Sequence, residues 1–217
     1  MSLTFYYVPM STSTITEAVL AELNLDYQGV ELDIDAGDTQ SESFLKVNPN
    51  GRVPVIVHEG VIIWESVAIT LYLGETFGSE KGLFPEPGPQ RGEAMKWVAW
   101  ANLNLADAAG KLAAELPPEA PGAVQQGSID FVPVEQRHPE AISKAKVNMN
   151  RCFEILNDAL ADRSFFLNNY SIVDTHLFVL VAWTLFMELD LAKYPSLEAW
   201  FARCIERPVL GAMMSEE

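Results

Sequence analysis

The hydrophobic and polar positions of the chain follow two different patterns. In the first part, short apolar runs typical of strands alternate with segments whose apolar residues recur at helical spacing. In the second part only the helical spacing recurs, over longer stretches. This order predicts a mixed α/β unit that is followed by an all-helical unit.

The first unit combines four predicted strands with three predicted helices. Runs rich in β-branched and aromatic residues predict strands at residues 4–8, 27–33, 55–58 and 61–64. Apolar residues at helical spacing predict helices at residues 14–23, 41–47 and 67–73. Glu59 and Gly60 are typical of a tight hairpin between the last two strands, and Ser66 stands where the last helix needs its N-cap. The resulting βαβ-ββα order is a thioredoxin-like pattern.

The second unit begins after a segment rich in proline and glycine. Residues 78–90 read GSEKGLFPEPGPQ, a composition typical of a linker between compact units. We therefore expect a first domain at residues 1–79, a linker at residues 80–90 and an all-helical domain at residues 91–217.

Long amphipathic helices are predicted within this second domain. They cover residues 91–116 and about 140–161. Between them, residues 117–139 contain five prolines and predict an extended loop. Ser171 and Asp174 have the spacing of a capping box, and the helix that they open is apolar enough to be largely buried.

The composition supports a folded globular protein with an acidic surface. The 217 residues are 49% hydrophobic and carry a net charge of −16. Because phosphate recognition rests on clustered Lys and Arg, nucleic acid and anionic membranes are poor partners for this chain. Residues 1–8 lack a basic region and a long apolar run, so we expect neither a signal peptide nor a membrane span, and a cytoplasmic protein.

The cysteines and histidines do not form a metal-binding pattern. Cys152 and Cys204 lie far apart in helical patterns, which favours reduced thiols over a disulfide framework. His58, His138 and His176 are scattered, so no metal site is expected. His176 lies on the apolar helix, where a hydrogen-bonded core residue is a better interpretation than a catalyst.

A proline at the mouth of a strand marks the first candidate site. Pro54 donates no ladder hydrogen bond, which suits a strand start or an edge. If the Val53–Pro54 bond is cis, Val53 offers its N–H and C=O to an extended ligand, which is strand addition on a small scale. A trans proline is the alternative, since only about 5 to 6% of X–Pro bonds in folded proteins are cis.

The predicted helix start at Ser66 supplies a second candidate site. Its free N–H groups and partial positive charge favour a carboxylate, and Glu65 beside them can pair with an ammonium group. A ligand that carries both groups is an amino acid or a peptide terminus. The alternative is that Ser66 is a cap and nothing more and that Glu65 is only solvated.

Four consecutive hydroxyl residues at positions 11–14 follow the first strand. A thiol bound there would be driven toward thiolate by the positive helix end and by a hydrogen bond from Ser11. Lowering its pKa by two units from about 8.5 requires about 2.7 kcal/mol, which one good hydrogen bond and a helix end can supply. The alternative is that all four hydroxyls are caps and turn formers.

Together these motifs resemble the cytosolic glutathione S-transferase superfamily over essentially the whole chain. The motifs that carry the resemblance, in order, are PMSTST at 9–14, NPNGRVPVI at 48–56, WES at 64–66, SIVDTHLF at 171–178 and YPSLEAWFARCIERP at 194–208. The resemblance implies an α/β thioredoxin-like N-terminal domain with a cis peptide at Pro54 and an all-α C-terminal domain. It also implies a homodimer that binds glutathione mainly through the first domain.

The resemblance also assigns glutathione-binding residues. It implies that Glu65 and Ser66 hold the γ-glutamyl end and that Val53 pairs with the cysteinyl backbone. Gln40 stands where several classes place a residue against the glycyl carboxylate. Arg52 precedes the Val–Pro pair, where others often carry Gln or Lys.

The thiol-activating residue implied by the resemblance is Ser11, since PMSTST looks most like the serine-type classes. In the bacterial beta pattern the same slot carries a cysteine and aligns with Thr12. Because this chain has no cysteine there, mixed-disulfide chemistry of the beta type is doubtful. Thr12, Ser13 and Tyr6 are the alternative residues.

The expected function is conjugation of glutathione to small hydrophobic electrophiles through a stabilised thiolate, as in detoxification. Residues expected to line the electrophile site are Met10, Trp97, Trp100 and Asn104, although core packing explains the tryptophans equally well. One alternative is a glutathione-dependent dehalogenase, isomerase or ether-cleaving enzyme, and the other is a non-catalytic glutathione-binding module.

Overall fold

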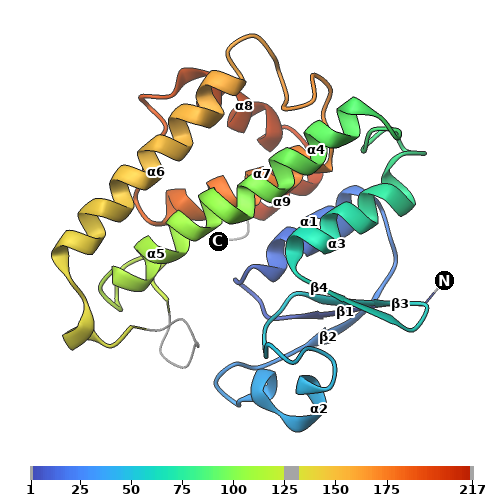
Figure 1. The fold of residues 1–217 in the computed structure, drawn as a ribbon, viewed down its shortest axis with the longest axis horizontal. Coiled ribbons are helices and arrows are strands. Elements are labelled where there is room, and N and C mark those ends of the chain that lie inside the picture. The colour runs from blue at the N-terminus through green and yellow to red at the C-terminus, as the bar shows by residue number, and fades with distance from the viewer. Residues whose placement is uncertain (1, 125–131, 216–217) are drawn as a thin grey trace.

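The computed structural model describes residues 2–124 and 132–215. Figure 1 shows a small sheet at one end of the molecule, with α1 and α3 on one face and α2 on the other, beside a larger helical part. The α/β and all-α fold class expected from the sequence is therefore confirmed. The boundaries proposed for the two domains and the linker stay a prediction.

A four-stranded mixed sheet forms the first part. Its strands are β1 (Leu3–Tyr7), β2 (Gln28–Glu31), β3 (Val55–His58) and β4 (Val61–Trp64), in the order β2-β1-β3-β4. β1 runs parallel to β2 and antiparallel to β3, and β3 and β4 form the predicted hairpin. Alternate residues of β1, Leu3 and Phe5, are buried, which fits a sheet covered by helices.

Three helices pack around this sheet. They are α1 (Ser13–Glu22), which crosses over between β1 and β2, α2 (Glu42–Leu45) and α3 (Ser66–Leu73). The prediction that Ser66 is the N-cap of α3 is wrong by one residue. Glu65 occupies that position with φ 73° and ψ 119°, and the Ser66 hydroxyl is engaged elsewhere.

The helical part contains the predicted long helices. One continuous helical stretch consists of α4 (Pro89–Trp100), a π-helical turn η3 (Ala101–Ala106) and α5 (Asp107–Glu115). The remaining helices are α6 (Pro139–Ala159), α7 (Ile172–Phe186), α8 (Pro195–Ile205) and α9 (Pro208–Ser215). No helix of the described residues is both long and apolar enough for a membrane span.

The buried helix α7 begins with the predicted capping box. The Ser171 side chain accepts from the helix backbone, and the Ser171 N–H donates to Asp174 Oδ2 at 3.0 Å. Asp174 also accepts from Trp200 Nε1 at 3.0 Å, which ties the helix start to α8. Burial of this carboxyl raises its pKa to about 6, and its hydrogen bonds partly oppose the shift.

The sheet and the helical part share one core. A single cluster of buried apolar side chains extends from Phe5 and Ile15 to Leu177 and Trp200. Cys152 and Cys204 are free and buried, and burial raises the pKa of both thiols. A catalytic role for either cysteine is therefore disfavoured.

The proline-rich segment follows α5. Residues 117–124 and 132–138 consist of turns, extended stretches and a short 3₁₀ turn, η4 (Val134–Gln136). This agrees with the predicted loop for the residues described, and the rest of that prediction, residues 125–131, lies outside them. The Val124 N–H donates to the Ala113 carbonyl at 3.2 Å, which holds the beginning of the segment against α5.

Candidate functional site

The Val53–Pro54 peptide bond is cis, as the first of the two sequence interpretations proposed. β3 begins directly after it, at Val55. The turn before it is fixed by Asn48, whose Nδ2 donates to the Arg52 carbonyl at 2.6 Å. The Val53 N–H has no acceptor among the residues that the structure describes. A backbone donor for an extended ligand is therefore present.

The carbonyl of Val53, in contrast, already has a partner. Thr12 Oγ1 donates to it at 3.1 Å across a separation of 41 residues. The carbonyl oxygen keeps a second lone pair, so the expectation that Val53 offers both backbone groups to a ligand stays a prediction. This contact places the start of α1 directly beside the cis-proline turn.

The hydroxyls at the start of α1 form a compact cluster. Ser11 Oγ donates to the Val8 carbonyl at 2.7 Å and accepts from the Ser13 N–H at 3.1 Å. Ser13 Oγ lies 3.0 Å from Ser11 Oγ, and Ser13 is buried. Thr12 is the N-cap residue but makes no side-chain cap bond. The cluster thus brings Ser11, Thr12 and Ser13 together at the positive end of a helix.

Met10 precedes this cluster in a left-handed conformation. Its φ is 54° and its side chain is 87% exposed. A non-glycine residue in this region costs backbone energy and is a feature of functional sites. Met10 is therefore an apolar side chain held in solvent next to the candidate thiol site.

The loop before the cis proline is closed by Gln40. Its Nε2 donates to the Gly51 carbonyl at 3.2 Å. Gly51 has φ 61°, and a Cβ on it would clash with Gln40 Nε2. Gln40 therefore stabilises the turn that carries Arg52 and Val53, and the predicted contact with a glycyl carboxylate stays a prediction.

The start of α3 combines an exposed carboxylate with a buried hydroxyl. Glu65 is exposed and holds the strained φ of 73°, whereas Ser66 is only 5% exposed. Ser66 Oγ accepts from Asn102 Nδ2 at 2.8 Å. Its own hydroxyl hydrogen has no acceptor among the described residues, so it remains available to a ligand.

A chain of buried hydrogen bonds continues from Asn102 into the helical part. Asn102 Oδ1 lies 2.7 Å from His176 Nε2, and His176 Nδ1 lies 2.9 Å from Thr70 Oγ1. Burial lowers the pKa of His176 to about 3, so its imidazole is neutral at physiological pH. The prediction of a hydrogen-bonded core histidine is confirmed.

The residues expected to line an electrophile site differ in exposure. Trp97 is buried between Trp100 and Phe166, so core packing accounts for its position. Trp100 is half-buried, and Asn104 is exposed with its Nδ2 3.3 Å from the Trp100 carbonyl. Trp100 and Asn104 lie on the same α4–η3 stretch as Asn102, which reaches Ser66.

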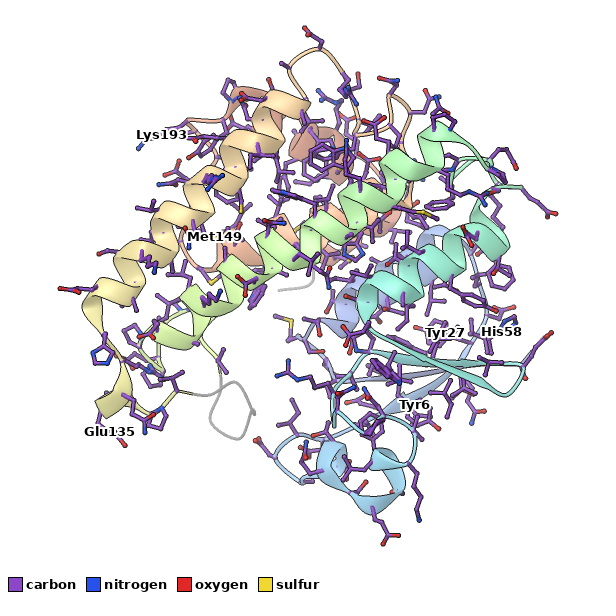
Figure 2. The ribbon with its side chains drawn as sticks, in the orientation of Figure 1. Tyr6, Tyr27, His58, Glu135, Met149 and Lys193 are labelled. Atoms are coloured by element: carbon purple, nitrogen blue, oxygen red, sulfur yellow. The ribbon has the colours of Figure 1, made fainter. Side chains whose placement is uncertain are left out.

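The Tyr6 side chain contacts α2 rather than the hydroxyl cluster. Its ring packs against Phe44 of α2 at a centroid distance of 5.9 Å, and Figure 2 shows it on the α2 side of the sheet. Its role as an alternative thiol activator stays a prediction.

Asn102 and Thr70 were missed by sequence reasoning. Thr70 lies one helical turn after Ser66, and Asn102 is a polar residue in an otherwise apolar part of a predicted helix. The only signal for Asn102 in the sequence was that it and Asn104 are polar in a largely apolar stretch. Their side-chain directions depend on the π-helical turn that contains both residues.

The comparisons with known proteins relate both parts of the chain to one family. Residues 1–75 match the model of the glutathione S-transferase N-terminal domain, and residues 117–208 match that of its C-terminal domain. Together the two matches span most of the chain.

Three relatives illustrate the similarity. The chain is 29% identical to the disulfide-bond oxidoreductase YfcG of Escherichia coli, over 95% of this chain and 91% of that protein. It is 29% identical to the glutathione S-transferase GstB of the same species, over 88% and 86%. A sphingomonad glutathione S-transferase solved with glutathione superposes with a TM-score of 0.78 at 25% identity, covering 96% of each chain. The chain therefore belongs to the glutathione S-transferase superfamily.

Proposed function

We propose that this protein conjugates glutathione to small apolar electrophiles. The observation that carries the proposal is the hydrogen bond from Thr12 to the Val53 carbonyl. It joins a peptide-binding element, the cis Val53–Pro54 turn, to a cluster of hydroxyls at a helix N-terminus. A tripeptide that pairs with the Val53 N–H would have its central side chain, a thiol, near that cluster.

The remaining contacts of glutathione follow from the charges at the site. The γ-glutamyl carboxylate would accept from the Ser66 hydroxyl and the first N–H groups of α3, and the ammonium group would pair with Glu65. Gln40 and Arg52, on either side of the Gly51 turn, are the proposed neighbours of the glycyl carboxylate. These assignments support binding of one zwitterionic peptide with a defined direction.

Ser11 is the proposed activator of the thiol. Its hydroxyl would turn from the Val8 carbonyl to the sulfur and stabilise the thiolate together with the α1 terminus. In the reaction, the thiol proton leaves to solvent and the thiolate forms a carbon–sulfur bond. The leaving group departs with the electron pair of the bond that breaks. Thr12, Ser13 and Tyr6 are the alternative activators.

The electrophile would bind between the hydroxyl cluster and the α4–η3 stretch. Met10 and Trp100 offer apolar surface there, and Asn104 offers a polar edge. Trp97 would support this wall from behind, because it packs edge-on against Trp100.

A homodimer in the cytoplasm is part of the proposal. The edge strand β4 exposes Val61, Ile62 and Trp64, an apolar set that a second copy would cover. Light scattering after gel filtration tests it, and a dimer that dissociates in Ile62→Glu would support this surface.

A glutathione-dependent disulfide reductase is the second candidate, which the similarity to YfcG favours. Both cysteines of this chain are buried with raised thiol pKa values, so glutathione itself would have to supply the attacking sulfur. Assays with a chloronitrobenzene and with a mixed disulfide separate the two candidates.

The decisive experiment measures glutathione binding by calorimetry together with the ultraviolet absorbance of the thiolate against pH. A bound thiol with a pKa well below about 8.5 supports the proposal. Ser11→Ala should then restore a near-normal thiol pKa and lower kcat at least about tenfold at neutral pH with little change in affinity. If Thr12→Val, Ser13→Ala or Tyr6→Phe is more damaging, that residue is the activator. An unshifted thiol would favour a non-catalytic binding module.

A further inference from the structure

We propose that His176, a buried residue of α7, is a positioning residue for the Ser66 hydroxyl. The inference rests on the proposed function, in which Ser66 holds a carboxylate of glutathione. The path consists of two hydrogen bonds, from His176 to Asn102 and from Asn102 to Ser66, and a third bond joins His176 to Thr70.

The protons of this chain can be assigned one after another. Asn102 Nδ2 donates to Ser66 Oγ at 2.8 Å, so the amide oxygen of Asn102 faces His176. An oxygen acceptor 2.7 Å from Nε2 requires that Nε2 carries the imidazole hydrogen. Nδ1 is then a bare acceptor for the hydroxyl of Thr70 at 2.9 Å. Every donor and acceptor between Thr70 and Ser66 is thereby used in one consistent direction.

The direction matters because Ser66 has only one hydroxyl hydrogen. Since Asn102 donates to Ser66, the Ser66 oxygen is occupied as an acceptor and its hydrogen is free to donate. If the amide of Asn102 turned over, its oxygen would face Ser66 and take that hydrogen. That reversed arrangement needs the other imidazole tautomer, in which Nδ1–H donates to Thr70 Oγ1. The hydroxyl hydrogen of the fully buried Thr70 would then have no acceptor among the described residues, so His176 and Thr70 together favour the observed direction.

Burial makes the arrangement stable. Thr70 and His176 are 0% exposed, so neither group can exchange its partner for water. Asn102 is half-buried and connects the buried His176 to Ser66, the proposed ligand contact. It lies in the π-helical turn η3, which directs its side chain toward both α3 and α7.

Two substitutions at position 176 distinguish the contribution of Nδ1 from that of Nε2. His176→Gln places an amide near the Nε2 position and can still donate to Asn102. His176→Asn reaches only the Nδ1 position, so it can serve Thr70 but leaves Asn102 without its donor. Both remove the ring and replace it with a neutral amide, so they are matched for burial of a polar group.

The test is calorimetric affinity for two ligands, glutathione and the analogue whose γ-glutamyl residue is replaced by 4-aminobutyrate, which lacks the α-carboxylate and keeps the amino group. His176→Asn should raise the Kd for glutathione about tenfold and leave the Kd for the analogue unchanged. His176→Gln should rescue most of the loss. A purely structural role would weaken both ligands alike, and this outcome would overturn the inference.

Two further variants complete the experiment. In the Ser66→Ala background, His176→Asn should cause no additional loss, because its effect passes through the hydroxyl. His58→Asn is the matched control. His58 is also a buried histidine, but it is hydrogen-bonded to Tyr72 and takes no part in the network of Thr70, His176, Asn102 and Ser66. Additive losses in Ser66→Ala/His176→Asn would contradict the proposal. If the unaltered protein binds no glutathione, the proposed function itself fails.

Discussion

Arg207 donates to both carboxylate oxygens of Glu22, which attaches the turn between α8 and α9 to the end of α1. The distances are 3.0 Å from Nε to Oε1 and 2.6 Å from Nη2 to Oε2, and the two residues are 185 positions apart. The Glu22 side chain is 2% exposed, and the guanidinium lies 3.7 Å from the centroid of the Tyr170 ring. The pair is thus bidentate, largely buried and covered by an aromatic face.

Loss of the cation should destabilise the whole fold. Arg207→Met leaves the Glu22 carboxylate buried without its partner, and we expect the free energy of unfolding to fall by about 2 to 3 kcal/mol. This is somewhat less than for a fully buried pair, because Arg207 is partly exposed. Urea denaturation measures it. Lys111→Met, which breaks the exposed pair with Asp107, is the control and should cost less than about 1 kcal/mol.

The pH dependence of stability should contain two opposing contributions. Asp174 has its pKa raised to about 6 in the fold, so the folded state binds more protons than the unfolded state between about pH 4 and 6. Its contribution to stability therefore falls as the pH rises through that window. Asp174→Asn should remove this slope, which amounts to about 3 kcal/mol over the window, although its lost hydrogen bonds lower stability at every pH.

His176 should act in the other direction. Burial lowers its pKa to about 3, so the unfolded state binds the extra proton below about pH 6.5. Stability is therefore lost as the pH falls from 6.5 toward 3. Relative to the unaltered protein, His176→Gln should reduce this acid sensitivity in denaturation curves recorded between pH 4 and 7. An unchanged slope would contradict the neutral, buried state of this imidazole.

A methyl group at Gly51 should disturb the turn before the cis proline. The position combines φ 61° with a Cβ that would meet Gln40 Nε2 and the Thr39 carbonyl oxygen. Gly51→Ala should lower stability by about 2 kcal/mol and weaken glutathione binding. Gly37→Ala is the control, because Gly37 has φ 80° but no atom within 4 Å of its Cβ position. It should show the conformational cost alone and leave the affinity unchanged.

Thr12 should hold the Val53 carbonyl through its hydroxyl rather than its size. Thr12→Val removes the donor, and we expect the Kd for glutathione to rise about three- to tenfold, the range for one neutral hydrogen bond. Thr12→Ser keeps the hydroxyl and should remain within about twofold. Equal losses in both variants would indicate that the methyl group matters instead.

Much of the fold could be predicted from the sequence because its signals are local. The short runs of β-branched and aromatic residues give β3 and β4 with their observed bounds, and Ser171 with Asp174 gives the start of α7. The cis state of Pro54 is different. The sequence alone leaves both states open with a base rate that favours trans, and the resemblance to a family is what implied cis.

The parts of the site that were missed depend on contacts between distant segments. Nothing near Thr12 in the sequence indicates that its hydroxyl reaches Val53, 41 residues away. Asn102 is 36 residues from Ser66 and 74 from His176, and its direction depends on a π-helical turn without a sequence signal of its own. Ser66 was misplaced by one residue because a glutamate in a left-handed conformation is not expected at an N-cap.

The bond between Ser11 and the Val8 carbonyl makes the proposed thiol activation a competition between acceptors. A neutral thiol is a weaker acceptor than a backbone carbonyl, so the Ser11 hydroxyl would keep its bond to the Val8 carbonyl when the ligand is protonated. A thiolate is a stronger one, since hydrogen bonds to charged groups are roughly twice as strong as neutral ones. The Ser11 hydroxyl would therefore distinguish the thiolate of the ligand from its thiol. The bond to the Val8 carbonyl would increase the preference of the site for the thiolate, which is the reactive form.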